Sequence, residues 1–442
     1  MAIPITATRF ILGTVNRGKY NSCSKNLYKG FNISLNERKR TRSITICHFQ
    51  STQLSRPVHC NKSSHHHFQL CSRWFSLHQT KSGSWKYTIP CTSPHLPMTV
   101  RCRQFSTPQK DEPSLSIPDI DPYKLVGPEI SCVAQDIRKQ LSPNEPQLKA
   151  MSHYYFDGKG KFFRPLVALL MSKACNNTSC VSDSISSKQK IVAIVSEMIH
   201  TASLVHDDVI DASDTRRGLS SLNKMYGQRK SILVGDYILS QASIALARTD
   251  NPRVITILSS VLEDLVSGEF MQLGSKEDEN ERFSHYLKKT YKKTASLIAN
   301  TCKAVAVLGE CDELMSELAY QYGRNLGIAF QLVDDLLDFI SSESIMGKPT
   351  AADLKLGLAT APVLFAAQEF PELHPMIMRR FSQVGDVEQA RDFVAKSDGV
   401  EQTKLLALHH SREAVNMLKD FAPSDAQRAL IKLAQILLDR KS

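Results

Sequence analysis

The chain has 442 residues, enough for one large domain or two of ordinary size. Apolar residues make up 42% and charged residues 22%, as in a globular protein, and no uninterrupted apolar run is long enough to cross a membrane. The net charge of +11 is unevenly spread, because residues 1–110 contain 17 Lys and Arg but one acid, Glu37. The remainder is mildly acidic, so the sequence argues against a nucleic-acid partner.

Residues 1–106 have the composition of a targeting segment. They are rich in Arg and Ser, nearly free of acids, and show no sustained apolar period. This composition is typical of an organelle transit peptide, and the segment Arg103 to Ser106 resembles a mitochondrial processing site. We predict a disordered mitochondrial transit peptide over 1–106, with a plastid as the alternative destination. A Pro-rich linker over 107–122 and one domain over 123–442 are expected to follow.

The cysteines indicate a reducing compartment. Six of the 11 lie in the leader, where no predicted element supports a metal site. The other five are spread from Cys132 to Cys311 and are expected to be isolated, unpaired thiols.

The part after about residue 115 is predicted to be helical. Apolar residues recur at spacings of three and four, for example over 191–205, 258–265 and 319–333. Strict alternation over the length of a strand is not evident. The polar segments 175–188 and 274–281 are predicted to be loops. The expected fold class is therefore all-α, as one domain.

Two aspartate clusters carry the predicted chemistry. Each has two adjacent aspartates and a third one three residues later: Asp207, Asp208 and Asp211, then Asp334, Asp335 and Asp338. The first and last of each cluster are four residues apart, so they project from one helical face. A solvated acidic face would explain a single cluster. That explanation weakens because both clusters end apolar helical stretches.

Paired carboxylates without a Cys or His ligand set favour a hard cation. Mg²⁺ takes one or two carboxylates per ion together with substrate phosphates, so two facing clusters predict a diphosphate site with Mg²⁺ as cofactor. Basic side chains would bind the remaining phosphate charge; the candidates are Lys161, Arg164, Arg216, Arg217, Lys293, Lys348 and Lys355. Lys161 and Arg164 are predicted to share a helical face. His200 lies about two turns before Asp207, as either a core histidine or, as we expect, a ligand contact.

The order of these motifs resembles that of the trans-polyprenyl diphosphate synthases. The resemblance rests on the two clusters, the segment Gly160 to Pro165, the run Arg216 to Gly218, the pair Lys293 and Thr294, and the segment Gly347 to Pro349. It covers about residues 125–440. Together with the leader, it points most strongly to the catalytic subunits of mitochondrial decaprenyl and solanesyl diphosphate synthases. One departure is Lys159, where the family often has Gly.

The resemblance implies an isoprenoid (terpenoid) synthase fold, with helices around a central cavity. It implies that the six cluster aspartates and Lys293 are catalytic, with Asp207, Asp211, Asp334 and Asp338 holding Mg²⁺. It also implies that Arg216 and Lys293 grip an allylic diphosphate. Isopentenyl diphosphate would be bound by Lys161, Arg164, His200 and Arg217, and the leaving group supported by Thr294, Gln331 and Lys348.

The implied activity is a long-chain trans-prenyltransferase that makes the polyprenyl diphosphate of the ubiquinone side chain. Short-chain members have aromatic residues four and five positions before the first cluster, whereas this chain has Ser203 and Ala202. These small residues predict a long product of nine or ten units, although close helix packing would also explain them. The alternatives are a terpene cyclase of the same fold and a non-catalytic regulatory subunit. Expected partners are a second synthase subunit, in a hetero-oligomer such as a heterotetramer, or a second copy in a homodimer, with peripheral membrane association.

Overall fold

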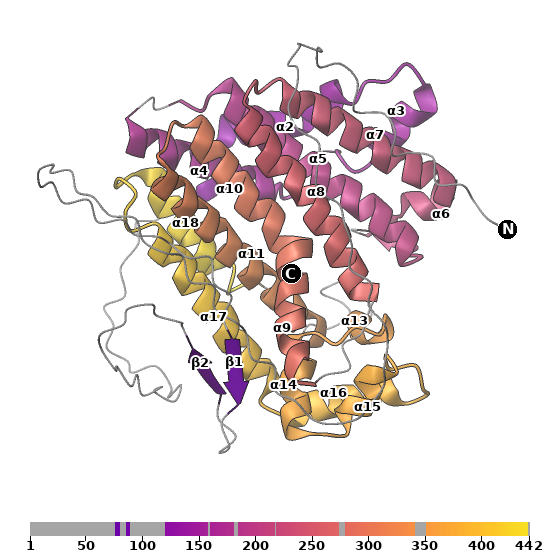
Figure 1. Cartoon of the computed structure of the whole chain (residues 1–442). Helices are drawn as coiled ribbons and strands as arrows, with labels where there is room; N and C mark the ends of the chain where they lie inside the picture. Colours follow the sequence, from indigo (N-terminus) through magenta and orange to yellow (C-terminus); the bar gives the residue numbers. More distant parts are fainter. Residues whose placement is uncertain are drawn as a thin grey trace, which may run out of the picture. The chain divides into compact units, whose positions relative to one another are not determined.

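The computed structural model describes residues 76–79, 85–88, 120–157, 160–180, 184–216, 218–273, 279–340 and 351–440. From residue 120 onward nearly all of them are helical (Figure 1). The first helices, in chain order, are α1 (Pro122–Leu125), α2 (Gly127–Gln140), α3 (Pro146–His153), α4 (Phe163–Ser179), α5 (Ser187–Ile210), α6 (Leu222–Tyr226), α7 (Gln228–Ala247) and α8 (Pro252–Leu273). The all-α expectation is confirmed.

The second half of the helical part continues in the same way. Its elements are α9 (Glu279–Thr290), a π-helical turn η1 (Tyr291–Ala295), α10 (Ser296–Leu308), α11 (Glu313–Ile340), α13 (Ala352–Lys355), α14 (Ala361–Glu369), α15 (Leu373–Met378), α16 (Asp386–Lys396), α17 (Gly399–Met417) and α18 (Asp425–Ile436). Two short strands, β3 (Thr215–Arg216) and β4 (Leu219–Ser220), form an antiparallel hairpin directly after α5.

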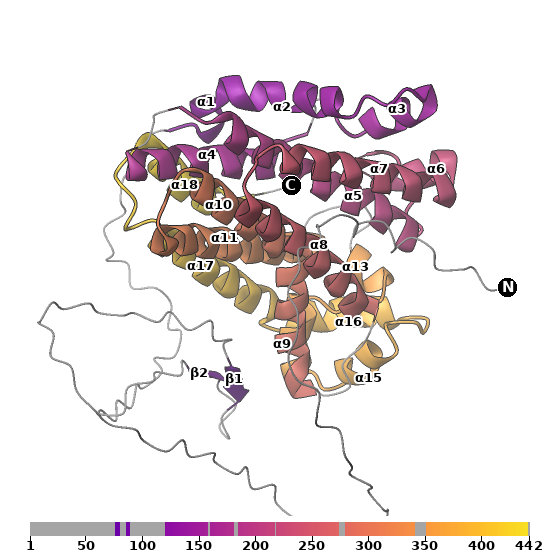
Figure 2. The same cartoon turned by 45° about the horizontal axis from the view of Figure 1, so that its top comes forward.

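The helices are arranged in layers. Figure 2 shows α1, α2 and α3 as an outer layer beside α4, α5 and α7, with α10, α11 and α17 beyond them. The core lies between α4, α5, α10 and α11, whose facing side chains are fully buried. One example is Tyr322, whose hydroxyl donates to the Leu430 carbonyl at 3.0 Å and so satisfies its only buried polar group.

The leader contains one described element. Strands β1 (Ser76–Gln79) and β2 (Trp85–Thr88) pair antiparallel, with Ser76 opposite Thr88. This pair differs from the prediction of a leader without secondary structure. The rest of the predicted transit peptide, and the predicted linker as far as residue 119, lie outside the described residues.

The helical part begins slightly before the predicted boundary. Ile120 packs against the core, and the Asp121 side chain caps α1 by accepting from the Tyr123 and Lys124 amides at 3.0 and 3.3 Å. Residues 120–122 therefore belong to the helical part.

The loop predicted over 175–188 is wrong in its first half. Helix α4 continues to Ser179, and Cys175 and Asn176 are buried. The polar side chains do not end the helix, because they bond back to its own carbonyls: Thr178 to Ala174 at 2.8 Å and Ser179 to Cys175 at 3.0 Å. The second predicted loop lies largely outside the described residues, and α9 begins at Glu279. None of the helices described is both long and apolar enough to span a bilayer.

Candidate active site

The first aspartate cluster lies where α5 ends. A capping box of Ser186 and Gln189 starts this helix, and Asp211 is its C-cap, with its amide bonded to the Asp207 carbonyl at 2.8 Å. Ala212 then takes a left-handed conformation, with φ of 49°, which ends the helix and lets the β3–β4 hairpin fold back. The cluster is therefore held at a sharp turn, as expected for residues that face a site.

Asp208 differs from its neighbours because it is buried and paired. Its side chain is 1% exposed, and Arg216 on β3 donates to Oδ1 from Nε at 2.8 Å and Nη2 at 2.5 Å. The Tyr155 hydroxyl donates to Oδ2 at 3.3 Å. A buried carboxylate needs such partners, so Asp208 fixes the hairpin and the guanidinium of Arg216. Arg217, the next residue in the sequence, lies outside the described residues.

Asp207 and Asp211 carry charge that is poorly compensated. Burial raises the pKa of Asp207 to about 6; Glu269 and Asp211 add to the rise, and Lys293 opposes it. The pKa of Asp211 is also raised, mainly by burial. Carboxyl groups near one another and partly out of water are stabilised as anions by a cation, so this pair fits a cation site.

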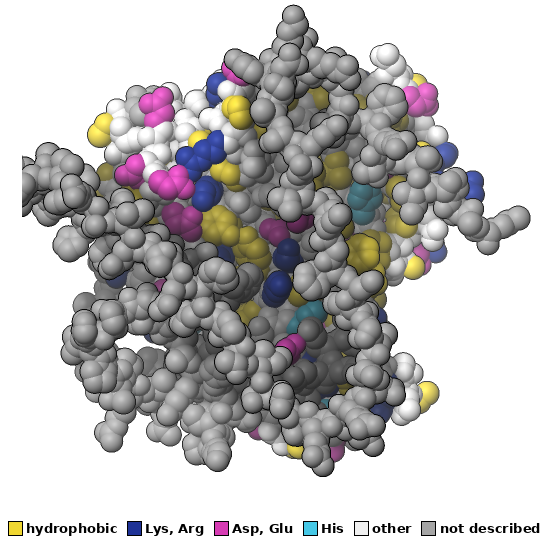
Figure 3. All heavy atoms as spheres, in the orientation of Figure 1, with side chains coloured by type: hydrophobic (Ala, Val, Ile, Leu, Met, Phe, Trp, Pro, Cys, Tyr) yellow, Lys and Arg dark blue, Asp and Glu magenta, His cyan; other side chains and the backbone are white. Residues whose placement is uncertain are grey.

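Lys293 faces this pair from the π-helical turn. Its Nζ donates to Glu269 Oε2 at 2.5 Å and to Gln272 Oε1 at 3.1 Å, both on α8. Gly268 leaves room for the lysine stem, since a Cβ there would lie 2.7 Å from Lys293 Cγ. Such π-turns are frequent at functional sites. Near the middle of the face in Figure 3, basic and acidic side chains gather close to α8 and α9.

The second cluster is linked to η1 by a chain of hydrogen bonds. The Thr294 hydroxyl donates to Gln331 Oε1 at 2.8 Å, and Gln331 Nε2 donates to Asp335 Oδ1 at 2.9 Å. Asp335 is buried and also accepts from the Tyr286 hydroxyl. Burial raises the pKa of Asp335 to about 6, against the effect of these hydrogen bonds. Asp335 thus has the same place in its cluster as Asp208, buried and bonded.

The outer aspartates of the second cluster have different partners. Asp334 pairs with Arg440 near the C-terminus, with Nη1 2.9 Å from Oδ1, and Arg440 also stacks 4.7 Å above the Phe330 ring. Asp338 accepts from the amides of Ala352 and Asp353 at 3.0 and 3.2 Å. Asp338 therefore bonds to the chain directly after residues 341–350. Those residues, which include Lys348, lie outside the described residues.

The predicted isopentenyl diphosphate contacts lie on neighbouring elements. Arg164 is in the first turn of α4, and His200 is on α5, which packs against α4. The prediction that Lys161 shares a helical face with Arg164 is wrong. Lys161 precedes α4, and Phe162 between them is left-handed with φ of 43°. The exposed Lys161 is tied instead through its carbonyl, which accepts from Tyr123 at 2.9 Å.

The two predicted chain-length positions lie on α5 below the first cluster. Ala202 is 0% exposed in the core. Ser203 is only partly buried, and its hydroxyl donates to the His200 carbonyl at 2.8 Å. The two positions therefore differ in how much volume they can accept. Lys355 lies at the end of α13.

Several residues of the site were not predicted from the sequence. They are Glu269, Gln272, Tyr286, Lys289 and Arg440. Glu269 and Gln272 are three apart at the end of an apolar helix, which is a detectable signal. Lys289 belongs to the same lysine-rich segment as Lys293, and burial lowers its pKa, opposed by Asp335 and Asp353. Arg440 is about a hundred residues from Asp334, and no local pattern relates them.

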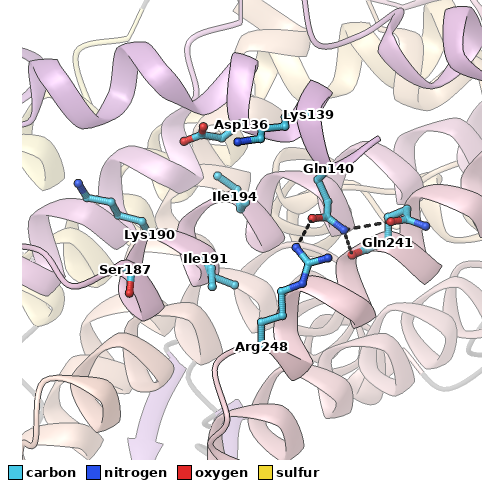
Figure 4. A pocket seen from close by; sticks show the side chains of 9 residues that line it. All are labelled: Asp136, Lys139, Gln140, Ser187, Lys190, Ile191, Ile194, Gln241 and Arg248. Atoms are coloured by element: carbon cyan, nitrogen blue, oxygen red, sulfur yellow. Dashed lines mark hydrogen bonds between the residues drawn. The ribbon is translucent and has the colours of Figure 1, made fainter. Parts of the chain in front are cut away.

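A pocket of about 440 Å³ lies apart from these residues, between α2, α5 and α7 (Figure 4). It is lined near the N-terminal end of α5, whereas the cluster lies at the other end of that helix. Gln140 bonds to Gln241 and Arg248 across it. The pocket contains none of the predicted site residues.

Comparison with known proteins agrees with this geometry. Residues 145–394 match the family model of polyprenyl synthetases. The chain is 58% identical over 320 residues to human "All trans-polyprenyl-diphosphate synthase PDSS1", covering 72% of this chain and 77% of that protein. It is 41% identical over 338 residues to "Solanesyl-diphosphate synthase 1, mitochondrial" of Oryza sativa, covering 72% and 79%.

A solved structure supports the same assignment. The polyprenyl synthase of Caulobacter crescentus, complexed with calcium and isoprenyl diphosphate, superposes with a TM-score of 0.66 at 30% identity. The match covers 73% of this chain and 97% of that one. The chain therefore belongs to the polyprenyl synthetase family.

Proposed function

We propose that this chain joins an allylic diphosphate to successive isopentenyl diphosphates between its two aspartate clusters. The chain is a long-chain trans-prenyltransferase of the mitochondrion, whose polyprenyl diphosphate supplies the ubiquinone side chain. One observation carries the placement of the reaction: Asp207 at the end of α5 and Asp211 at its C-cap, both with raised pKa values, face Lys293 on η1. A diphosphate substrate with its cation fits between such groups.

The side chains fit Mg²⁺ held jointly with a diphosphate. Within the described ranges, no three His, Cys, Asp or Glu side chains lie close enough to hold a metal ion alone. That suits Mg²⁺, which takes one or two carboxylates and completes its coordination with water and phosphate oxygens. We assign Asp207 and Asp211 to one such site, and Asp334 and Asp338 to the other. When bound, Mg²⁺ would offset the negative charge that develops on the departing diphosphate.

The chain's own side chains would bind and position the two substrates. Lys293, held in place by Glu269 and Gln272, would bind the allylic diphosphate from the side opposite α5. Arg216, positioned by Asp208, would bind it from the hairpin. Gln331 would donate to the leaving group and connect it to the second cluster, and Thr294, whose hydroxyl donates to Gln331, would hold that side chain in position. Lys161, Arg164, His200 and Arg217 would anchor isopentenyl diphosphate, whose double bond attacks the allylic carbon at close range. Apolar walls around Ala202 would exclude water from the cation.

The two alternatives are not favoured. A terpene cyclase does not need anchors for isopentenyl diphosphate, yet this chain has both Lys161, just before α4, and Arg164, in its first turn. A regulatory subunit does not need its carboxylates, yet all six cluster aspartates are retained.

We also propose that the chain works with a second subunit. An extended product of nine or ten isoprene units exceeds about 40 Å, comparable to a small domain, so it needs a cavity continued by a partner or open to a membrane surface. Both α7 and α8 expose large apolar side chains that could bind a partner. Leu233 on α7 is 64% exposed and Phe270 on α8 is 73% exposed.

The activity is tested by diphosphate release from isopentenyl diphosphate with dimethylallyl or farnesyl diphosphate, followed by mass analysis of the product. We expect a long polyprenyl diphosphate that depends on both substrates and on Mg²⁺. Asp207→Ala should abolish turnover, whereas Asp214→Ala, an exposed neighbour paired with Lys224, should not. Diphosphate release from the allylic substrate alone would indicate a cyclase and overturn the proposal.

The partner is tested by light scattering with and without the second subunit. Leu233→Ser should weaken assembly and shorten or abolish long products. Ile436→Ser is the matched control, because Ile436 is also a large exposed apolar residue, at 45% exposure, but lies on α18. A stable monomer with full long-chain activity would contradict the partner proposal and leave the activity proposal standing.

A further inference from the structure

Three buried or partly buried cysteines meet at the end of the bundle opposite the aspartate clusters. Cys175 lies on α4, Cys302 on α10, and Cys311 in the turn before α11, and all three are free thiols. The Cys311 sulfur donates to the Cys175 carbonyl at 3.9 Å. The turn lies about 30 Å along α11 from Asp334, since each helical residue advances about 1.5 Å. This cluster therefore takes no part in the proposed reaction.

The fold holds the turn against α4 by a set of polar contacts. The Ser179 hydroxyl donates to the Gly309 carbonyl at 2.7 Å. Asn176 and Gln189 exchange two amide hydrogen bonds, and Gln189 also donates to the Val305 carbonyl at 3.1 Å. Because these contacts are satisfied and buried, the turn is fixed relative to Cys175 rather than free to move away.

Gly309 allows the turn to approach α4 closely. A Cβ on Gly309 would lie 2.8 Å from Asn176 Oδ1 and 3.4 Å from the Cys175 Cβ. A larger residue would push the turn, and Cys311 with it, away from α4. The two thiols thus face each other across a contact that the backbone maintains.

The two thiols have complementary chemistry. Cys311 is partly exposed, and its hydrogen bond with the Cys175 thiol lowers its pKa, because that thiol stabilises a Cys311 thiolate. Cys175 is fully buried, and its pKa is raised by the same hydrogen bond and by burial. Reactive cysteines are accessible and have a low pKa, whereas buried ones are inert until a partner reaches them.

We propose that Cys175 and Cys311 form a dithiol that hydroperoxides oxidise to a disulfide. The Cys311 thiolate attacks the peroxide O–O bond, so that Cys311 becomes a sulfenic acid and hydroxide leaves. The Cys175 sulfur then attacks the sulfenic sulfur, the S–O bond breaks, and hydroxide departs with the Cys175 proton as water. Two thiols are oxidised and one hydrogen peroxide is reduced to two waters. The product links α4 to the start of α11.

The test is peptide mapping of the full chain after treatment with hydrogen peroxide, without a reductant. We expect a cross-linked peptide pair containing Cys175 and Cys311, which dithiothreitol separates. The cross-link should form about tenfold faster than oxidation of the exposed Cys132, because thiolate content rises with a lowered pKa. The oxidised chain should also melt at a higher temperature than the reduced one, because the disulfide closes a long loop.

Three variants separate the roles. Cys175→Ser should leave Cys311 as a sulfenic acid that dimedone traps, and Cys311→Ser should abolish the cross-link. Cys302→Ser is the matched control, since Cys302 is buried in the same cluster and should leave the cross-link intact. A Cys175 to Cys302 cross-link, or oxidation of Cys311 in the unmutated chain to a sulfinic acid without any cross-link, would overturn the assignment.

Discussion

The two aspartates Asp207 and Asp208 are adjacent in sequence but have opposite electrostatic environments. Asp208 is buried and neutralised by Arg216. Asp207 is flanked by Glu269 and Asp211, and the nearby Lys293 is already bound to Glu269. The Asp207 carboxylate therefore destabilises the folded chain, and a bound cation would remove this destabilisation. Such perturbed groups are common at functional sites.

The charge of Asp207 makes a prediction for the metal-free protein. Its folded pKa of about 6 lies above the ordinary 3.8, so the folded state binds this proton more tightly than the unfolded state does. Protonation of Asp207 therefore stabilises the folded state; this stabilisation is fully present below about pH 4 and is lost as the pH rises through about 6. Asp207→Asn should therefore raise the free energy of unfolding by about 1–2 kcal/mol at about pH 7.5, and less at about pH 4.5.

Urea unfolding at both pH values, without divalent cations, measures this difference. Asp214→Asn is the control, because the exposed Asp214–Lys224 pair should change stability by less than about 1 kcal/mol. Equal stabilisation at the two pH values would contradict the pKa assignment. Addition of Mg²⁺ and inorganic diphosphate should stabilise the unmutated chain but not Asp207→Asn.

A second prediction at the scale of one residue concerns Arg440 and the Mg²⁺ requirement. Its guanidinium neutralises Asp334 in a partly exposed pair, so it competes with a cation for that carboxylate. Arg440→Gln should lower the Mg²⁺ concentration for half-maximal turnover by about two- to fivefold, the range of an exposed ion pair. Arg428→Gln, which breaks an exposed pair within α18, should leave it unchanged. A higher Mg²⁺ requirement would instead assign Arg440 to the substrate.

At the scale of elements, the π-turn η1 is positioned by close packing against α11. Gly327 of α11 makes this possible, since a Cβ there would lie 2.6 Å from the Ala295 Cα at the end of η1. Gly323 brings α11 equally close to α10, where a Cβ would lie 2.8 Å from the Ala299 Cα. The contact at Gly327 brings Thr294 within hydrogen-bond distance of Gln331. The helix-to-helix distance thus determines how η1 and the second cluster connect.

Gly327→Ala tests this packing. The added methyl meets backbone, which has little freedom to move, so we expect a loss of about 1–3 kcal/mol of stability. Turnover should fall further than stability alone explains, because the Thr294–Gln331 bond lengthens. Gly127→Ala is the control, since a Cβ there has open space. Calorimetry and steady-state kinetics give both quantities. Unchanged kinetics in a folded Gly327→Ala protein would refute the link.

Helix α5 makes a prediction about product length. Ser203 and Ala202 lie about one turn, roughly 5.4 Å, below Asp207. Ser203→Phe should shorten the product without loss of the first condensation, because the ring would block the tail and leave the diphosphate site unchanged. Ala202→Phe is the harder test, since Ala202 is fully buried and overpacking costs about 1–3 kcal/mol. Reversed-phase separation of dephosphorylated products measures chain length. A folded Ser203→Phe protein with only the unmutated product would disprove this path.

At the scale of the whole molecule, the sequence predicted the helical class and both clusters, because both follow local rules. Apolar periodicity indicated α5 and α11 and placed each cluster at the end of an apolar helical stretch, and the spacing of the aspartates put the outer two of each cluster on one helical face. The predictions that were wrong concern residues whose conformation depends on contacts that a local pattern does not show. The left-handed Phe162 breaks the helix predicted through Lys161, and Cys175 is helical because its polar neighbours bond back to α4. Glu269 and Arg440 join the site only through tertiary packing.

The predicted domain boundary gives a final prediction for the whole chain. The apolar core includes Val126 with 0% exposure, and Ile120 packs against it, whereas residues 1–106 have the composition of a transit peptide. Removing 1–106 should leave the melting temperature and turnover unchanged and abolish mitochondrial import.

Removing 1–126 is the matched comparison. It deletes Val126, the packing of Ile120 and the Tyr123 bond to the Lys161 carbonyl, so it should destabilise the protein by several kcal/mol. Because the bond to Lys161 holds the start of α4, affinity for isopentenyl diphosphate should also fall. Circular dichroism melts and kinetics of both truncated chains decide the question. If the chain without 1–106 melts as early as the chain without 1–126, the leader, including its β1–β2 pair, is part of the folded enzyme.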